Sequence, residues 1–300
     1  MRTRDWQAMV RWLLSPEAGR VLGMNRRNLG YVYPCNPRRF LPLADDKVLT
    51  KEVLVRAGVP VPTTLGIYRH FFELRRLGED LAPHEEFVIK PARGRGGGGI
   101  VVVAGRTGAS WTSISNRVLT VAELRRHITD IIFGVYSSEL ADAALIEERV
   151  CQHPELEDLS PLGLADVRVI LLRDRPVLAM VRVPTRKSEG RANLHLGGIG
   201  IDIDPDTGRT GRALHDRLEV RRHPDTGAVL SGRTVPFWEE VLRVSRMAAE
   251  AFPLKYIGID VSIAGTGPMV LEINARPGLE IQNVTRRCLQ ALLVKRGEQS

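Results

Sequence analysis

The chain has 300 residues, of which 43% are hydrophobic and 26% charged, and its formal net charge is +8 at pH 7. This length can bury one large core or two to three small ones, and the composition is that of a folded globular protein. No apolar run is long enough to span a membrane, and Arg and Asp interrupt the apolar residues of the N-terminus, which excludes a signal peptide. The positive charge favours anionic partners such as nucleotides or acidic metabolites. The basic residues are spread along the chain without interleaved aromatics, which argues against a specific nucleic-acid surface.

The three cysteines, Cys35, Cys151 and Cys288, are far apart and lack any CxxC or Cys/His ligand spacing. Such usage is typical of a reducing compartment. We therefore expect a cytoplasmic protein without disulfides.

Residues 1–44 are expected to form an N-terminal helix and a wrapping segment. Residues 1–22 carry apolar side chains at helical spacing, whereas residues 23–44 are rich in Arg, Asn, Pro and Gly and are predicted to run as a loop over a domain surface. The cluster Asn25-Arg26-Arg27-Asn28 would suit an acidic substrate, although a solvated loop is the simpler account.

A helix is predicted over residues 45–58, because acids open it and Gly58 closes it ahead of two prolines. Lys47 lies in its first turn, where a lysine is unfavourable against the helix dipole. Its position indicates a partner anion.

A glycine-rich loop follows the predicted strand 87–91, which carries Lys90, and precedes a strand at residues 100–103. Glycines allow backbone N–H groups to surround phosphate oxygens, and the neighbouring lysine and arginines add positive charge. The loop is not a Walker A motif, since no GK[ST] follows and a strand comes next. A phosphate-binding loop is the favoured interpretation and a plain hairpin the alternative. The glycines singled out for contact with phosphate are Gly96, Gly97 and Gly98.

The middle of the chain alternates strands, helices and a basic loop. A capping box at Thr120–Glu123 opens a helix to about residue 136, and a strand at 144–150 carries two acids. A hairpin is expected from 166–172 and 176–183. The loop 184–200 holds many donors beside glycines, which suggests phosphate or carboxylate binding, with a solvated basic loop as the alternative. The amphipathic segment 236–252 is predicted to pack as a helix against the sheet.

The stretch 257–274 predicts two apolar strands, 257–263 and 269–273, joined by a turn centred on Thr266. Such a turn would place Asp260 directly across from Glu272, and Asn274 would share the face of Glu272 because side chains two apart in a strand point the same way. Carboxylates in apolar strands are costly unless a positive partner lies beside them. These hard oxygens suit Mg²⁺ or Mn²⁺. An edge hairpin with solvated acids is the alternative.

In chain order the motifs are DK at the head of a helix, VIK before a glycine loop, EERV, DVR, RANLH and D…E-x-N-x-RPG. Together they resemble the ATP-grasp superfamily, most closely its RimK-type α-L-glutamate ligases, over about residues 23–285. The resemblance implies an α+β fold in which two lobes with antiparallel sheets grip ATP. The expected parts are an N-terminal segment (1–44), a small lobe with a glycine-rich lid (45–150) and a large lobe with a metal-binding hairpin (151–300).

The same resemblance assigns roles to individual residues. Lys47 and Lys90 would contact the nucleotide, and the loop 93–99 would cover its phosphates. The hinge that reads adenine and ribose would comprise Glu147, Glu148 and Val150. Two Mg²⁺ ions would be held by Asp260, Glu272 and Asn274. The groups expected at the substrate carboxylate and the transferred phosphate are Arg168, Arg182, Arg191 and Asn193, with Arg276 beside them.

Three departures from the RimK-type pattern concern the substrate side. The chain starts almost at the DK helix, so a full N-terminal domain is expected to be replaced by about forty residues. Leu196 follows the NLH motif where an arginine is usual, and Arg276 stands where a small residue is usual before PG. In ATP-grasp ligases the N-terminal domain helps to enclose the substrate, so the substrate cannot be carried over from RimK. The changes at Leu196 and Arg276 fall near the acceptor side and leave the nucleotide motifs intact.

The expected function is ATP-dependent carboxylate–amine ligation through an acyl phosphate, which adds glutamate or another amino acid to a peptide or small acceptor. One alternative is an ATP-grasp ligase that acts on a sugar-linked or cell-wall precursor. A second is a non-catalytic nucleotide-binding regulatory module, and a third, from the net charge, is a nucleic-acid-binding protein. The sequence leaves the acid, the amine and the oligomeric state open.

Overall fold

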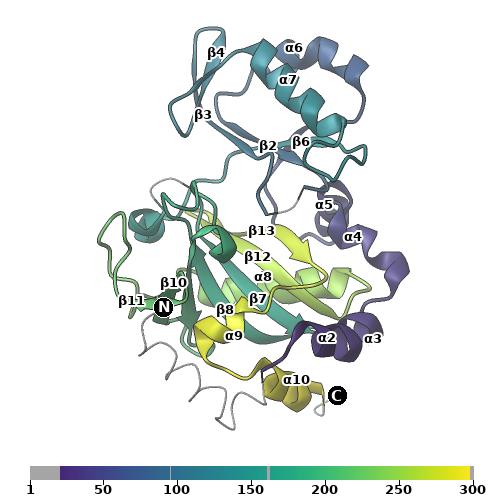
Figure 1. The fold of residues 1–300 in the computed structure, drawn as a ribbon. Helices are drawn as coiled ribbons and strands as arrows, with labels where there is room; N and C mark the ends of the chain where they lie inside the picture. The colour runs from purple at the N-terminus through teal and green to yellow at the C-terminus, as the bar shows by residue number, and fades with distance from the viewer. Residues whose placement is uncertain (1–20, 95, 161–162, 298–300) are drawn as a thin grey trace, which may run out of the picture.

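The computed structural model describes residues 21–94, 96–160 and 163–297. Nearly all of the helix expected over residues 1–22 therefore lies outside the described residues. Two sheets, each antiparallel throughout, form the centres of two lobes that stack above one another (Figure 1). This is the expected α+β architecture. In the described parts of the chain no helix combines the length and apolar composition that a membrane crossing requires.

The small lobe is a six-stranded sheet with the strand order β1-β6-β2-β3-β4-β5. Its strands are β1 (Thr64–Tyr68), β2 (Phe87–Pro91), β3 (Val101–Thr107), β4 (Ser110–Ser113), β5 (Val118–Leu119) and β6 (Ala144–Glu147). The helical elements that accompany it are η4 (Phe71–Arg76), α6 (Leu77–Leu81) and α7 (Val121–Ile132). The expected capping box at the start of α7 is present, because Thr120 and Glu123 bond each other's backbone N–H. The amphipathic helices bury their apolar faces against the sheet in one core.

The large lobe is a seven-stranded sheet with the order β11-β10-β9-β8-β7-β12-β13. Its strands are β7 (Asp166–Leu172), β8 (Arg175–Val183), β9 (Ile199–Ile203), β10 (Thr210–His215), β11 (Leu218–Val220), β12 (Tyr256–Ala264) and β13 (Gly267–Asn274). The predicted helix near the C-terminal third is α8 (Trp238–Ala251), which packs on one face of this sheet, as expected. The short η5 (Pro154–Leu159) and η6 (Leu194–Leu196) lie in connections, whereas α9 (Glu280–Thr285) and α10 (Leu289–Gly297) contact β8 on the opposite face.

Helix α5 (Lys47–Arg56) confirms the helix predicted near the start of the motifs and lies between the lobes (Figure 1). The Asp46 side chain accepts hydrogen bonds from the N–H groups of Val48 and Leu49, which caps the helix. Leu54 is buried in the core of the seven-stranded sheet, whereas Val48 packs with small-lobe residues. Helix α5 therefore contributes to both lobes.

The loop predicted over residues 23–44 is wrong, since this segment is largely helical. It comprises α2 (Met24–Arg27), η2 (Asn28–Val32), α3 (Tyr33–Cys35), η3 (Arg38–Phe40) and α4 (Pro42–Asp45). Its fixed point is Asn36, which is 2% exposed, donates to the carbonyls of Tyr256 and Ala275 and accepts from two backbone N–H groups. Tertiary packing, which a Pro- and Gly-rich composition does not reveal, supplies this order.

Candidate active site

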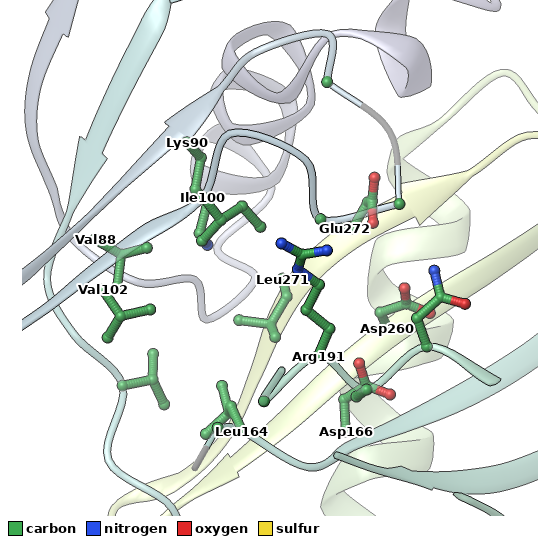
Figure 2. Close-up of a pocket in the computed structure, with 18 of the residues that line it drawn as sticks. Val88, Lys90, Ile100, Val102, Leu164, Asp166, Arg191, Asp260, Leu271 and Glu272 are labelled. Atoms are coloured by element: carbon green, nitrogen blue, oxygen red, sulfur yellow. The ribbon is translucent and has the colours of Figure 1, made fainter. Parts of the chain in front are cut away.

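A cleft of about 1460 Å³ lies between the lobes and collects nearly all of the residues that the sequence singled out. The small lobe supplies Lys90 and the glycine loop, and the large lobe supplies the hairpin β12–β13 and the 191–193 loop (Figure 2). Of the predicted site residues, Gly98 and Glu147 are not among those that line it. The strand order of two separate sheets thus brings together motifs as far apart in the chain as Lys47 and Arg276.

One half of the cleft is apolar. Val88, Ile100 and Val102 face it from the small lobe, and Leu164 and Leu271 from the large lobe (Figure 2). The chain just after β6, with Glu148 and Val150, also lines it. A slot with apolar walls can accept a flat base.

The glycine loop between β2 and β3 is fixed at both ends. Arg93 donates its backbone N–H to both carboxylate oxygens of Asp142 at 3.1 Å, and the Gly99 carbonyl lies 2.9 Å from Nε2 of His127. Gly99 has φ +73°, and a Cβ there would lie 2.6 Å from the ring of Tyr136, so only glycine fits. The two ends are therefore fastened to the small lobe.

The middle of this loop faces the large lobe. A Cβ on Gly97 would lie 3.1 Å from Cδ of Arg191, and one on Gly96 would lie 3.7 Å from the amide nitrogen of Asn193. Figure 2 shows the guanidinium of Arg191 directed towards the loop. Arginine and backbone N–H groups together can surround an anion here.

Lys47 has the anionic partner that its place in the first helical turn indicates. Its Nζ lies 3.4 Å from Oε1 of Glu272 and donates to the Gly94 carbonyl at 2.9 Å. The lysine thus joins the start of the glycine loop to the large-lobe hairpin.

Glu147 lies outside the cleft and is 4% exposed. Its two carboxylate oxygens pair with the ammonium groups of Lys51 and Lys90, the latter at 2.5 Å. Burial alone would raise the pKa of Glu147, but the charges of the two lysines outweigh it and lower the pKa. The sequence did not single out Lys51, although it stands one helical turn after Lys47 and so shares its face of α5.

The floor of the cleft is a network of two arginines and two aspartates on three neighbouring strands. Arg168 donates through Nε and Nη2 to the two oxygens of Asp260, at 2.7 and 2.6 Å. Arg182 binds Asp166 in the same two-pronged manner, at 2.7 and 2.5 Å, and reaches Asp260 at 2.8 Å. Each guanidinium keeps its Nη1 outside these contacts, so the network can also offer donors to the cleft.

Burial and charge act in opposite directions on these two carboxyl groups. Burial alone would raise the pKa of Asp260, but the charges of Arg168 and Arg182 lower it below its usual range. Burial raises the pKa of Asp166 to about 6, although Arg182 opposes this. Asp260, which also belongs to the predicted metal-binding set, is therefore held as an ionised carboxylate.

The hairpin register confirms the predicted pairing of Asp260 with Glu272, but the turn and the strand geometry that produce it differ from the prediction. The turn is one residue tighter than expected, since Ala264 pairs with Gly267. An irregularity between Asp260 and Val261 leaves Leu271 as an extra residue and restores the register. Leu271 and Glu272 consequently both line the cleft.

The oxygens of Asp260, Glu272 and Asn274 form a hard donor set that fits Mg²⁺. Glu272 is far more accessible than Asp260, with 36% of its side chain exposed. Asp260 shares its oxygens with arginines and with the amide of Asn274, at 3.3 Å. Among the described residues, no three or more His, Cys, Asp and Glu side chains are grouped as metal ligands. The set proposed here has only two carboxylates, since its third member is the amide of Asn274.

Arg276 lies at the cleft edge and forms a two-pronged pair with Asp45 of α4, at 2.9 and 3.0 Å. The sequence predicted Arg276 as a substrate-side cation and gave no sign of Asp45, 231 residues away. The residues that sequence reasoning passed over as site components are Asp45, Lys51, Asp166 and the apolar wall. The sequence contains a signal for two of these residues. Lys51 lies one helical turn from Lys47, and Asp166 lies two residues from Arg168 on the same face of a strand.

The two lobes, the cleft between them and the glycine loop define an ATP-grasp fold. The crystal structure of the biotin carboxylase–β-γ-ATP complex from Campylobacter jejuni is similar in fold, with a TM-score of 0.52 at 14% identity, and the match covers 84% of this chain and 46% of that one.

The chain belongs to the sugar-transfer associated ATP-grasp family, whose model matches residues 26–296. It is 24% identical over 251 residues to a probable α-L-glutamate ligase of Pseudoalteromonas translucida, and 25% identical over 250 residues to the ribosomal protein bS6–L-glutamate ligase of Escherichia coli. Each match covers 83% of this chain and 61% of the relative, so the chain spans about three fifths of their length. The resemblance to ATP-grasp and RimK-type proteins inferred from the motifs is confirmed.

Proposed function

We propose that this protein is an ATP-dependent carboxylate–amine ligase. The single observation that carries the proposal is the division of one cleft into an apolar half and a charged half with hard oxygens, lysines and arginines. A base fits the first half and a triphosphate fits the second. Membership of the ATP-grasp family supports the same conclusion.

The reaction follows from the chemistry of a carboxylate, which is a poor acyl donor because its leaving group would be oxide. An oxygen of the substrate carboxylate attacks the γ-phosphorus of ATP, the bond to the β-phosphate oxygen breaks, and ADP leaves. A neutral amine then attacks the carbon of the acyl phosphate, inorganic phosphate leaves with the bonding electrons, and the nitrogen loses its proton. Positioning and charge neutralisation dominate phosphoryl transfer.

In this scheme the residues of the cleft divide the work. Lys47 and Lys90 would hold phosphate oxygens of ATP, and Arg191 would hold the substrate carboxylate and the phosphate in transfer. The glycine loop would keep water from the acyl phosphate. Asp260, Glu272 and Asn274 would hold Mg²⁺, which neutralises charge on phosphate oxygens when bound. Two ions, as expected from the resemblance, belong to this proposal.

The acid and the acceptor are proposed at the level of their class. The curated relatives are glutamate ligases, whereas the family that matches is associated with sugar transfer. Arg276 and Leu196 alter the substrate side, where RimK-type ligases have other residues. We therefore propose an acidic amino acid or a carboxylate-bearing sugar derivative as the acid that is activated.

The test is release of ADP and phosphate from Mg·ATP in the presence of two pools, one of amino acids and one of uronic-acid sugars and their nucleotide conjugates. Stimulation by one pool, lost in Glu272→Gln and kept in Glu250→Gln on the exposed side of α8, would support the proposal. Tight Mg·ATP binding without stimulated release, in both pools and with peptide acceptors added, would favour the nucleotide-binding regulatory module instead. Binding to nucleic acid that weakens steeply with salt and does not depend on ATP would favour a nucleic-acid-binding protein.

A further inference from the structure

A largely buried ion triad at the wall of the cleft links the two lobes. It consists of one carboxylate, Glu147, between the ammonium groups of Lys51 and Lys90. Lys51 is 8% exposed and Glu147 4% exposed. Removing three charges from water is costly, and one carboxylate cannot neutralise two cations. A merely structural core would more simply use apolar residues at these positions.

Two members lie on strands of the small lobe, and the third lies on α5, which is also anchored in the large lobe. Glu147 and Lys90 lie on the neighbouring strands β6 and β2, where Val88 pairs with Glu147. Lys51 lies on α5, whose Leu54 is buried in the core of the seven-stranded sheet and which contacts β13 and α8. The pair between Lys51 and Glu147 therefore spans the lobe boundary directly behind the cleft.

The carboxylate divides its oxygens between the two lysines. Oε1 meets Lys51 and Oε2 meets Lys90, so Lys51 determines which oxygen is left for Lys90. Lys90 lines the cleft, whereas Glu147 does not. When both lysines are charged, the triad carries one positive charge that Glu147 does not neutralise. Lys90 presents this charge to the cleft, because it is the member that lines it.

We propose that Glu147 is a positioning residue for Lys90 and that Lys51, acting through Glu147, couples the nucleotide-binding lysine to the position of the large lobe. This role replaces the contact with adenine that the sequence suggested for Glu147. The inference rests on the proposed function in one respect, namely that Lys90 binds a phosphate of ATP.

The test is a double-mutant cycle on the dissociation constant of Mg·ATP, measured by calorimetry on the full chain. Loss of a charge-assisted contact predicts an increase of about tenfold in Kd for Glu147→Gln. Lys51→Met is expected to raise Kd similarly. Without Lys51, both oxygens of Glu147 would attract Lys90 and draw it away from the phosphate of ATP. In the Glu147→Gln background, Lys51→Met should add little. A matched control exists on the same helix, where Glu52 and Arg56 form an exposed pair at 3.5 Å, so that Glu52→Gln and Arg56→Met should leave Kd unchanged.

The sign of the change separates positioning from simple electrostatics. If Glu147 only neutralised charge, Glu147→Gln would tighten ATP binding, and Lys51→Met would weaken it equally in both backgrounds. Either result would overturn the proposal. Should the single variants fail to fold, the double variant Lys51→Met/Glu147→Gln removes the pair together, and a Kd equal to that of the natural chain would also overturn it.

A second measurement needs no nucleotide. Hydrogen exchange of the amides in α5 and β6 should accelerate in Lys51→Met and not in Arg56→Met, since only the former breaks the link between the lobes. Unchanged exchange would contradict the coupling even if ligation is later found. Conversely, tight ATP binding and faster exchange without any ligation would refute the proposed function and leave this inference standing. Absence of Mg·ATP binding by the natural chain would refute both.

Discussion

The two ion clusters at the cleft differ in their balance of charge. The floor network pairs two arginines with two aspartates, whereas the triad between α5 and the small lobe sets two lysines against one glutamate. A network of balanced charge fixes geometry and presents little net charge to a ligand. An unbalanced one presents a cation to an incoming anion. Under the proposed function, the floor would supply shape and donor oxygens, and the small lobe would supply positive charge for phosphate.

The largest effect is expected where the balance of the floor is broken. Asp260→Asn would leave two buried guanidinium groups with one carboxylate, which should cost about 3–5 kcal/mol of stability and abolish turnover. Urea unfolding followed by circular dichroism would measure the loss. Asp206→Asn, at an exposed turn, is the control and should change stability by less than about 0.5 kcal/mol. A loss at position 260 no greater than in this control would show that the network does not hold the floor together.

Glu272→Gln tests the accessible edge of the same donor set. It exchanges a carboxylate for an amide of the same shape, so turnover should fall by about 100-fold or more. Its unfolding free energy should change by less than about 1 kcal/mol, because its pair with Lys47 is partly exposed. Steady-state ADP release at saturating ATP gives the rate, and normal turnover would exclude Glu272 from the metal set.

Lys90→Met tests the cation that the triad presents. Removing it should raise the Kd of Mg·ATP by about tenfold or more, since a charge-assisted contact to phosphate is lost. Lys255→Met, an exposed lysine outside the cleft, should leave the Kd unchanged. Equal affinities in the two variants would contradict the assignment of positive charge to the small lobe.

The smallest effect is expected at the substrate side of the cleft. Arg191→Ala should raise the KM of the activated acid or lower kcat by about tenfold, while the Kd of ATP stays within about threefold. Arg186 belongs to the same loop but does not line the cleft, so Arg186→Ala serves as the control. A parallel loss of ATP affinity in Arg191→Ala would move this arginine from the acid to the nucleotide.

Local patterns in the sequence predicted most of the fold. Strand 87–91, the capping box at Thr120 and the helix that begins after Asp46 are all present, because each depends on residues within one or two turns. The segment 23–44 was misjudged as loop, since its helices depend on packing and on Asn36 binding backbone groups about 220–240 residues away. Local composition carries no record of such partners.

The candidate site divides in the same way. The sequence by itself determined which residue types gather at the hairpin, since two apolar strands joined by a short turn bring Asp260, Glu272 and Asn274 close together. The irregularity at Leu271, which sets Asp260 opposite Glu272, came only with the structure. Only the tertiary structure decided that the same aspartate is shared by Arg168 and Arg182, and that Glu147 faces two lysines instead of the cleft. The physical reason is that an ion pair depends on distance in space, and that distance is set by strand order and by the seating of α5 between the lobes.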